Sequence, residues 1–361
     1  MSPDVSIHDI QPDDLRRIAR NRRSFWAALA LTAVIILGAG MVAGGGWWGW
    51  SQALSETLVW ALHVGAAVAP GLVWLGFFAL LEREDEGGRR VAFLLWIITA
   101  ALYLVTVQPL LARVFQLDAW LFMGWWADIL ADFLIVAPLE MLLVYLILRY
   151  GVYPGETMRR LVDGPLFGVA SALGAAAIVS LIAVWPNALF TPDDVLVAGE
   201  RALGYAALGG WLGYALARNR FSRTPGYYLP GVFLLVVSLH ALFYALVRGA
   251  HALAFAAPLY SGLVTAAILA LLSFALLAWR VRKRNRAFLN MAARVEIAQE
   301  RERPPSLLGD VLQMADARAF EGARTPPPPP PTSPTPPREE DELASLKRSW
   351  EALIAEQEEK P

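Results

Sequence analysis

Eight long apolar segments limit the possible folds of this chain more than any other feature. An apolar helix needs about 20 residues to cross the hydrocarbon core of a bilayer. The segments that qualify are Trp26–Val42, Leu58–Leu81, Val91–Leu111, Ala127–Leu148, Pro165–Val184, Leu196–Ala217, Leu229–Val247 and Phe255–Trp279. The composition, 57% hydrophobic and 17% charged over 361 residues, excludes an ordinary soluble domain. We therefore predict an all-α fold, with residues 25–281 forming a bundle of eight transmembrane helices.

Basic residues between these segments alternate between rich and poor connections. The rich regions are the N-terminal segment (Arg16, Arg17, Arg20, Arg22, Arg23), the second connection (Arg83, Arg89, Arg90), the fourth (Arg149, Arg159, Arg160), the sixth (Arg218, Arg220, Arg223) and the stretch after the last span (Arg280, Arg282, Lys283, Arg284, Arg286). The first and fifth connections have no Lys or Arg, and the third and seventh have only Arg113 and Arg248. This positive-inside pattern predicts that both termini are cytoplasmic. We expect a bacterial cytoplasmic membrane, with the first span uncleaved.

Tryptophans mark the ends of several predicted spans. Trp47, Trp48, Trp50 and Trp185 lie at outer ends, and Trp26 and Trp279 lie at inner ends. Because Trp favours the interface between lipid and water, we interpret these residues as interfacial anchors.

Four stretches lie outside the predicted membrane domain. Residues 1–24 are a short cytoplasmic segment, and 282–323 are predicted to extend the last helix and add a short one. Residues 324–338, with six consecutive prolines from Pro326, are predicted to be an extended polyproline spacer. Residues 339–361 place an apolar stripe on an acidic helix: Leu343, Leu346, Trp350 and Leu353. Such a stripe can dock into a groove of a cytoplasmic protein, or it can be a solvated tail.

Few ionisable residues lie within the apolar segments. They are His63, Asp128, Asp132, Glu140, Glu200, Arg201 and His240. Asp128, Asp132, Glu200 and Arg201 lie near span ends, where we expect water to reach them. Glu140 and His240 are deep, and a charge at such depth costs from about 3 to above 10 kcal/mol unless it is relieved. A glutamate and an imidazole could share a proton across the bundle, either as a structural pair or as a functional site.

Other chemistry has weak support. With no cysteine in the chain, disulfides and Cys-ligated metals are excluded. A zinc site would have to combine Glu140, His240 and His63 from three segments without a ligand motif, so we predict no metal and no cofactor. No GxSxG motif marks a serine nucleophile. Small residues in Gly168–Ala177, at Gly209–Gly210 and at Gly213 are predicted to let helices approach closely.

Residues 127–249 resemble the PrsW-type glutamic intramembrane proteases. Four pieces match in order and spacing: Ala137-Pro138-Leu139-Glu140, Asp163-Gly164 with Gly168 and Gly174, Arg201-Ala202-Leu203 with Gly213-Tyr214, and Leu239-His240-Ala241-Leu242. The resemblance implies a helical membrane peptidase, with Glu140 and His240 as the catalytic residues if the protein is active.

The departures from the family pattern fall on the chemistry. Met141 replaces the second glutamate and Val144 the lysine, Val179 and Ser180 replace a Glu-Asn pair, Tyr205 replaces the histidine, and Tyr244 stands at another polar position. A carboxylate pair works by separating two pKa values, and a metal-assisted centre needs several ligands. One glutamate and one histidine supply neither in full.

The sequence therefore leaves three functional hypotheses. The leading one is a PrsW-like membrane scaffold or regulatory protein with a degraded protease site, which binds a transmembrane segment without cutting it. The second is a divergent intramembrane protease that uses Glu140 and His240. The third is a transporter or channel built around the same pair. We expect lipid and protein partners, and no nucleic acid.

Overall fold

The computed structural model describes residues 11–20, 22–43, 55–82, 85–117, 125–155, 157–185, 187, 189–222, 224–253 and 258–302, and every extended regular element in these ranges is a helix. The Pro-rich spacer (324–338), the acidic helix (339–361) with its apolar stripe, and Trp47, Trp48 and Trp50 lie outside the described residues.

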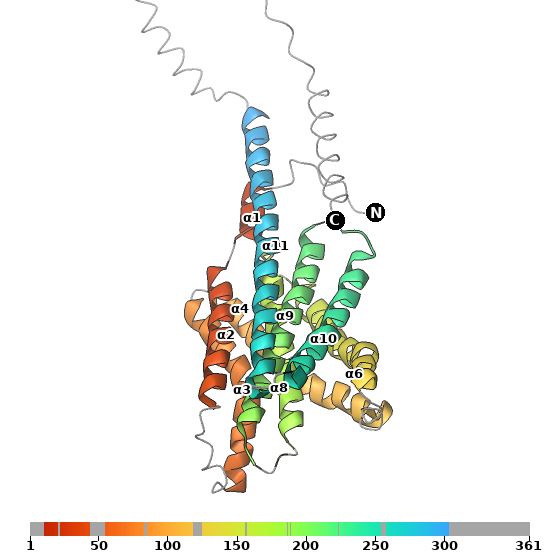
Figure 1. Cartoon of the computed structure of the whole chain (residues 1–361). Helices are drawn as coiled ribbons and strands as arrows, with labels where there is room; N and C mark the ends of the chain where they lie inside the picture. The colour runs from red at the N-terminus through yellow and green to blue at the C-terminus, as the bar shows by residue number, and fades with distance from the viewer. Residues whose placement is uncertain are drawn as a thin grey trace, which may run out of the picture. The chain divides into compact units, whose positions relative to one another are not determined.

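The predicted spans are present as helices (Figure 1). In chain order the elements are α1 (Pro12–Ile18), α2 (Arg23–Ala43), α3 (Glu56–Leu81), α4 (Glu86–Leu102), η3 (Tyr103–Val107), η4 (Leu110–Val114), α6 (Trp125–Ala131), η6 (Asp132–Val136), α7 (Ala137–Ile147), η7 (Leu148–Val152), α8 (Asp163–Val184), α9 (Pro192–Phe221), α10 (Tyr228–Leu253) and α11 (Pro258–Glu302). Helix α11 continues well past the last apolar segment, which ends at Trp279.

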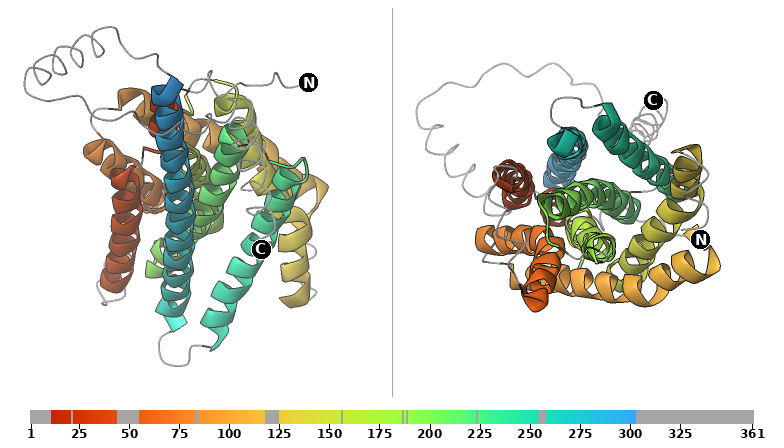
Figure 2. Two further views of the ribbon diagram at one scale, coloured as in Figure 1. Left: turned by 90° about the horizontal axis from the view of Figure 1, so that it is seen from above. Right: turned by 60° about the horizontal axis from the view of Figure 1, so that its bottom comes forward.

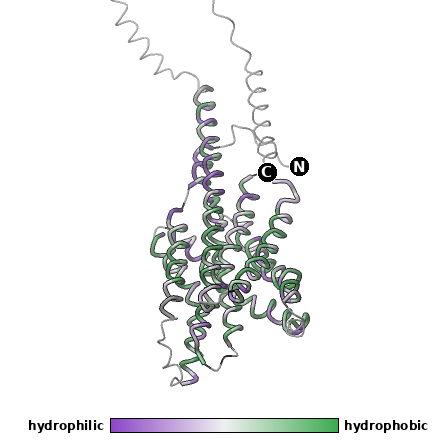
Figure 3. The backbone as a smooth tube through the Cα atoms, viewed as in Figure 1, coloured by the Kyte–Doolittle hydropathy of each residue, from purple (hydrophilic) through white to green (hydrophobic). Residues whose placement is uncertain are grey.

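Seven helical stretches among the described residues are long and apolar enough to cross a membrane. They correspond to seven of the eight predicted segments. The remaining segment, Leu196–Ala217, lies within α9, which is long but carries charged residues such as Glu200 and Arg201. Apolar residues cover most of the bundle, while hydrophilic ones gather on α1 and on the distal part of α11 (Figure 3).

Helices α8 and α9 form the centre of the bundle, with the other helices around them (Figure 2). In the most apolar stretch of α8, 72% of the residues are buried, against 28–39% in the other six candidate spans. Glycines make this packing possible, as predicted: a Cβ on Gly168 would collide with the carbonyl oxygen of Gly209, and one on Gly213 with that of Gly164. The two backbones touch, so no larger residue fits at this crossing.

Two prolines explain the wide helical turns next to the polar centre of the bundle. Pro109 and Pro138 lack the N–H group that an α-helix needs at those positions. In both places the residue before the proline bonds five residues back: Gln108 N–H to Tyr103, and Ala137 N–H to Asp132. The resulting π-turns change the rotational phase of the helix, and such turns are frequent at functional sites.

Candidate functional site

Glu140 lies at the centre of a buried polar cluster. It is in the first turn of α7, just after the π-turn η6, and its side chain is 2% exposed. The helix faces α4, η3, α8, α9 and α10. Because an isolated charge at such a site is costly, its partners decide what the carboxylate can do.

Two tyrosine hydroxyls donate to Glu140, one to each carboxylate oxygen. The Tyr103 hydroxyl, at the start of η3, lies 2.6 Å from Oε1. The Tyr205 hydroxyl, from α9, donates to Oε2. Both tyrosines are buried, with 2% and 1% of their surfaces exposed. Two donors from two helices fix the carboxylate in place and compensate its removal from water.

His240 is the third partner of Glu140. Its Nε2 lies 3.1 Å from Oε2 of Glu140, close enough for an ion pair but not aligned as a hydrogen bond. The imidazole is 1% exposed and lies edge-on to the Tyr205 ring at 5.5 Å between centroids. The centroid of the Tyr244 ring lies 4.9 Å from that of the imidazole. The structure thus brings together the two residues that the sequence selected, Glu140 and His240.

Neither ring nitrogen of His240 has a hydrogen-bond partner among the described residues, and the same holds for the buried Tyr244 hydroxyl. Such groups are costly in an apolar interior unless water or a ligand satisfies them. The cluster can therefore hold a proton or a polar molecule next to His240 and Tyr244. The hydroxyls of Tyr103 and Tyr205 already bond the two carboxylate oxygens of Glu140.

His63 does not join Glu140 in the structure. It is fully buried in α3, with its Nε2 3.4 Å from Oδ2 of Asp194 at the start of α9. Asp194 also accepts from Asn187 and from Thr191, so it caps α9. Over the described ranges, no group of three or more His, Cys, Asp or Glu side chains is placed to hold a metal ion.

The residues expected near water at the span ends behave in two ways. Asp128 and Asp132 have side chains 29% and 14% exposed, and both pair with Arg248 of α10, at 3.4 and 3.3 Å. For Glu200 the expectation is wrong: its side chain is only 8% exposed, and Oε1 lies 3.1 Å from His251 Nε2. The cause is the length of α10, which reaches Leu253 and brings His251 alongside α9.

Sequence reasoning missed the role of the tyrosines. No feature of the sequence around Tyr103 indicates that it belongs to a site, because tyrosines are common in apolar spans. Tyr205 and Tyr244 were treated as losses relative to the family pattern, yet they line the same cluster as Glu140 and His240. Their positions in the resemblance could have indicated that they face the site.

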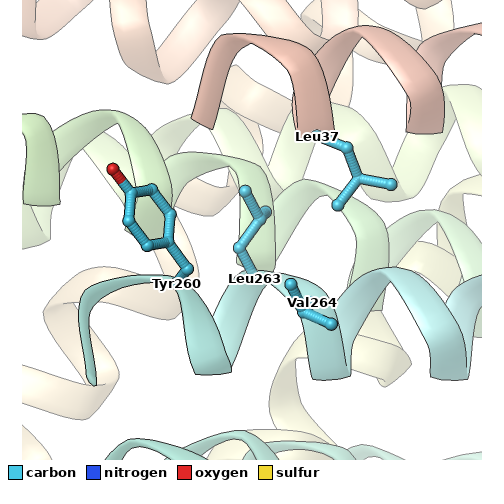
Figure 4. A pocket seen from close by; sticks show the side chains of 4 residues that line it. All are labelled: Leu37, Tyr260, Leu263 and Val264. Carbon is cyan, nitrogen blue, oxygen red and sulfur yellow. The ribbon is translucent and has the colours of Figure 1, made fainter. Parts of the chain in front are cut away.

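A separate crevice of about 320 Å³ lies between α2 and α11 (Figure 4). It is lined by Leu37, Tyr260, Leu263 and Val264 and shares no residue with the Glu140 cluster. Its lining is apolar except for one tyrosine, as expected of a surface that faces lipid.

The comparisons with known proteins add no relative. No protein-family model matches the chain, no curated protein matches it significantly, and no solved structure does. The assignment of function therefore depends on the geometry of the chain itself.

Proposed function

We propose that α9 also crosses the membrane, giving eight spans with both termini on the cytoplasmic side. At 30 residues and about 1.5 Å per residue, α9 is about 45 Å long, more than the hydrocarbon core requires. Its position beside α8 at the centre of the bundle supports the same reading.

Contacts between connections support this topology. Segments predicted to be cytoplasmic contact one another: Arg22 pairs with Asp85 and Asp163, and the side chain of Asn219 bonds the hydroxyl of Tyr153 at 2.9 Å. The predicted outer ends of two spans also contact each other, since the ring centroids of Trp60 and Trp185 lie 4.0 Å apart. An ion pair between Arg16 of α1 and Glu296 of α11 supports termini on one side.

We further propose that the protein is a PrsW-like scaffold of the bacterial cytoplasmic membrane that binds a transmembrane segment without hydrolysing it. The observation that carries this proposal is the enclosure of the Glu140 carboxylate by buried side chains. Each oxygen accepts from a buried tyrosine hydroxyl, and His240 contacts the same carboxylate.

This enclosure matters because a general base must contact a water molecule beside the scissile carbonyl. Hydrolysis also needs donors for the developing oxyanion. Here the donors nearest Glu140, Tyr103 and Tyr205, point at the carboxylate itself. At the position of the family's histidine, Tyr205 supplies a hydroxyl that holds Glu140, which converts a reacting group into a structural one.

Purified protein incubated with single-span membrane proteins tests the proposal. We expect the wild type and Glu140→Gln to give the same intact substrates, while both retain a bound segment in photo-crosslinking. Tyr145→Phe, a change on the same helix whose ring packs on Phe233, is the matched control. Cleavage by the wild type that is lost in Glu140→Gln would overturn the scaffold proposal.

One observation favours the alternative, a divergent intramembrane protease. The 3.1 Å approach of His240 to Glu140 fits a Glu–His dyad, in which the imidazole orients the base. This alternative predicts that His240→Ala abolishes cleavage as fully as Glu140→Gln. A transporter would instead show proton-coupled uptake in proteoliposomes.

A further inference from the structure

A row of polar residues on α10 faces a second row on the helix formed by α6, η6 and α7. On α10, His240, Tyr244 and Arg248 follow at intervals of four and so share one face. The opposite helix carries Asp128, Asp132 and Glu140. The rows meet at both ends: Arg248 pairs with the two aspartates, and His240 contacts Glu140. Tyr244 lies between these contacts on α10.

Exposure falls steadily along the rows. The side chain of Arg248 is 49% exposed, that of Asp128 29% and that of Asp132 14%. Those of Glu140 and His240 are 2% and 1% exposed. The rows thus lead from a solvated end of the bundle to its buried centre.

Tyr244 connects the two ends. Its hydroxyl is buried with no hydrogen-bond partner in the described part of the chain, and it lies within electrostatic range of the carboxylates of Glu140 and Asp132. A tyrosine hydroxyl can accept one proton and release another. A bridging water would satisfy it and Nδ1 of His240 together.

We propose that these rows form a proton-access path from the membrane surface at Arg248 to Glu140. Two carboxylates and one guanidinium give the entrance a net charge of −1, which attracts protons. Asp132 takes up a proton from the aqueous surface and passes it to the Tyr244 oxygen as that hydroxyl releases its own proton to Nδ1 of His240. The other nitrogen then releases a proton to Oε2 of Glu140. Asp132, Tyr244 and His240 end in their starting charge states, and Glu140 becomes neutral.

The titratable and charged groups that face Glu140 come from four elements. They are Tyr103 on η3, Asp132 on η6, Tyr205 on α9, and His240 and Tyr244 on α10. Glu200 and Arg201 of α9 act on the tyrosines beside Glu140. Tyr103 and Tyr205 donate to Glu140 and close the cluster on their side. Arg201 is engaged by the carbonyl of Val179. The path therefore enters from the Arg248 side, and it adds proton exchange to a site that the proposed function treats as closed to substrate.

Infrared spectroscopy of the full chain in lipid nanodiscs tests the path. The protonated carboxyl band in acidic buffer is assigned to Glu140 by its loss in Glu140→Gln, and its shift in D₂O gives the exchange rate. We expect Tyr244→Phe to slow exchange about tenfold, which corresponds to about 1.4 kcal/mol in the barrier to proton transfer. Tyr145→Phe should exchange as the wild type does. No band assignable to Glu140, or equal rates in the wild type and Tyr244→Phe, would overturn the proposal.

A second measurement separates the path from a local effect of the Tyr244 substitution. Because the chain has no cysteine, Asp132→Cys offers a single thiol for a bulky, membrane-impermeant reagent. We expect labelling there to slow Glu140 exchange further. The control is Tyr227→Cys, beside the opposite end of α10, where the native side chain is 77% exposed. Equal rates before and after labelling of Asp132→Cys would contradict an entrance at this end. Neither measurement depends on whether substrates are cleaved.

Discussion

Replacing Arg22 by alanine tests whether a buried ion network joins the N-terminal segment to the bundle. The Arg22 side chain is only 4% exposed and lies among three carboxylates, those of Asp163, Asp85 and Glu82. Its Nε is 3.1 Å from Asp163, whose side chain is 2% exposed. Without the guanidinium, the buried carboxylate of Asp163 loses its ion-pair partner.

Removing one partner of a buried ion pair costs about 3–5 kcal/mol. The lower end applies here, because Asp163 still accepts from the backbone N–H groups of Arg159 and Arg160, at 3.0 and 2.8 Å. Asp85 likewise keeps the N–H of Gly88 at 3.0 Å. We therefore expect Arg22→Ala to lower the free energy of unfolding by about 3 kcal/mol.

Unfolding of the purified protein in mixed micelles, followed by circular dichroism, measures this loss. The matched control is Arg17→Ala, because Arg17 is 64% exposed and its pair with Asp14, at 3.7 Å, contributes about 0–1 kcal/mol. A double-mutant cycle of Arg22→Ala with Asp163→Asn should give a coupling energy above 1 kcal/mol, a value of about the size found for contacting residues. If Arg22→Ala destabilises no more than Arg17→Ala, the network does not hold the segment.

Four further outcomes are expected. Burial raises the pKa of Asp85, but the Gly88 N–H and the Arg22 guanidinium lower it more, so the folded pKa lies below the ordinary 3.8. Its stabilising contribution is present above 3.8 and lost as pH falls below it, so acid unfolding of the wild type should be steeper than that of Asp85→Asn. Gly168→Val should destabilise the bundle by at least about 1–3 kcal/mol in the same unfolding assay, because it forces α8 from α9. Tyr205→Phe should cost about 1–2 kcal/mol there and should shift the infrared band of Glu140, whereas no shift would argue against the bond. Deleting 339–361 should abolish co-purification of a soluble partner but leave membrane insertion intact; unchanged partner recovery would contradict docking by this segment.

The helical spans could be predicted from the sequence because the hydrophobicity of a span is the sum of the contributions of its residues. The described residues of each predicted segment are helical, and the small residues at Gly168 and Gly209 are where two backbones meet. Glu140 and His240 could be predicted to pair because both lie deep within apolar spans, away from water. Few other side chains in those spans could form a polar contact with them. The count of eight spans and the cytoplasmic termini stay predictions.

The partners of these residues could not be obtained in the same way. Tyr103 and Tyr205 look like ordinary apolar-span residues until the helices are assembled. Glu200 was expected near water and is instead buried beside His251, since the reach of α10 depends on how that helix packs. The pairing of Arg248 with Asp128 and Asp132 joins helices more than 100 residues apart in sequence.

By itself, the sequence determined that this chain forms apolar helices and that Glu140 needs a partner, because both follow from the transfer energies of individual residues. Only the tertiary structure decided which groups meet Glu140. Side-chain encounters depend on the rotation of each helix about its axis, and Pro109 and Pro138 alter that rotation through the π-turns that begin at Tyr103 and Asp132. These two residues belong to the cluster and to its access row, so the turns help decide which groups face Glu140.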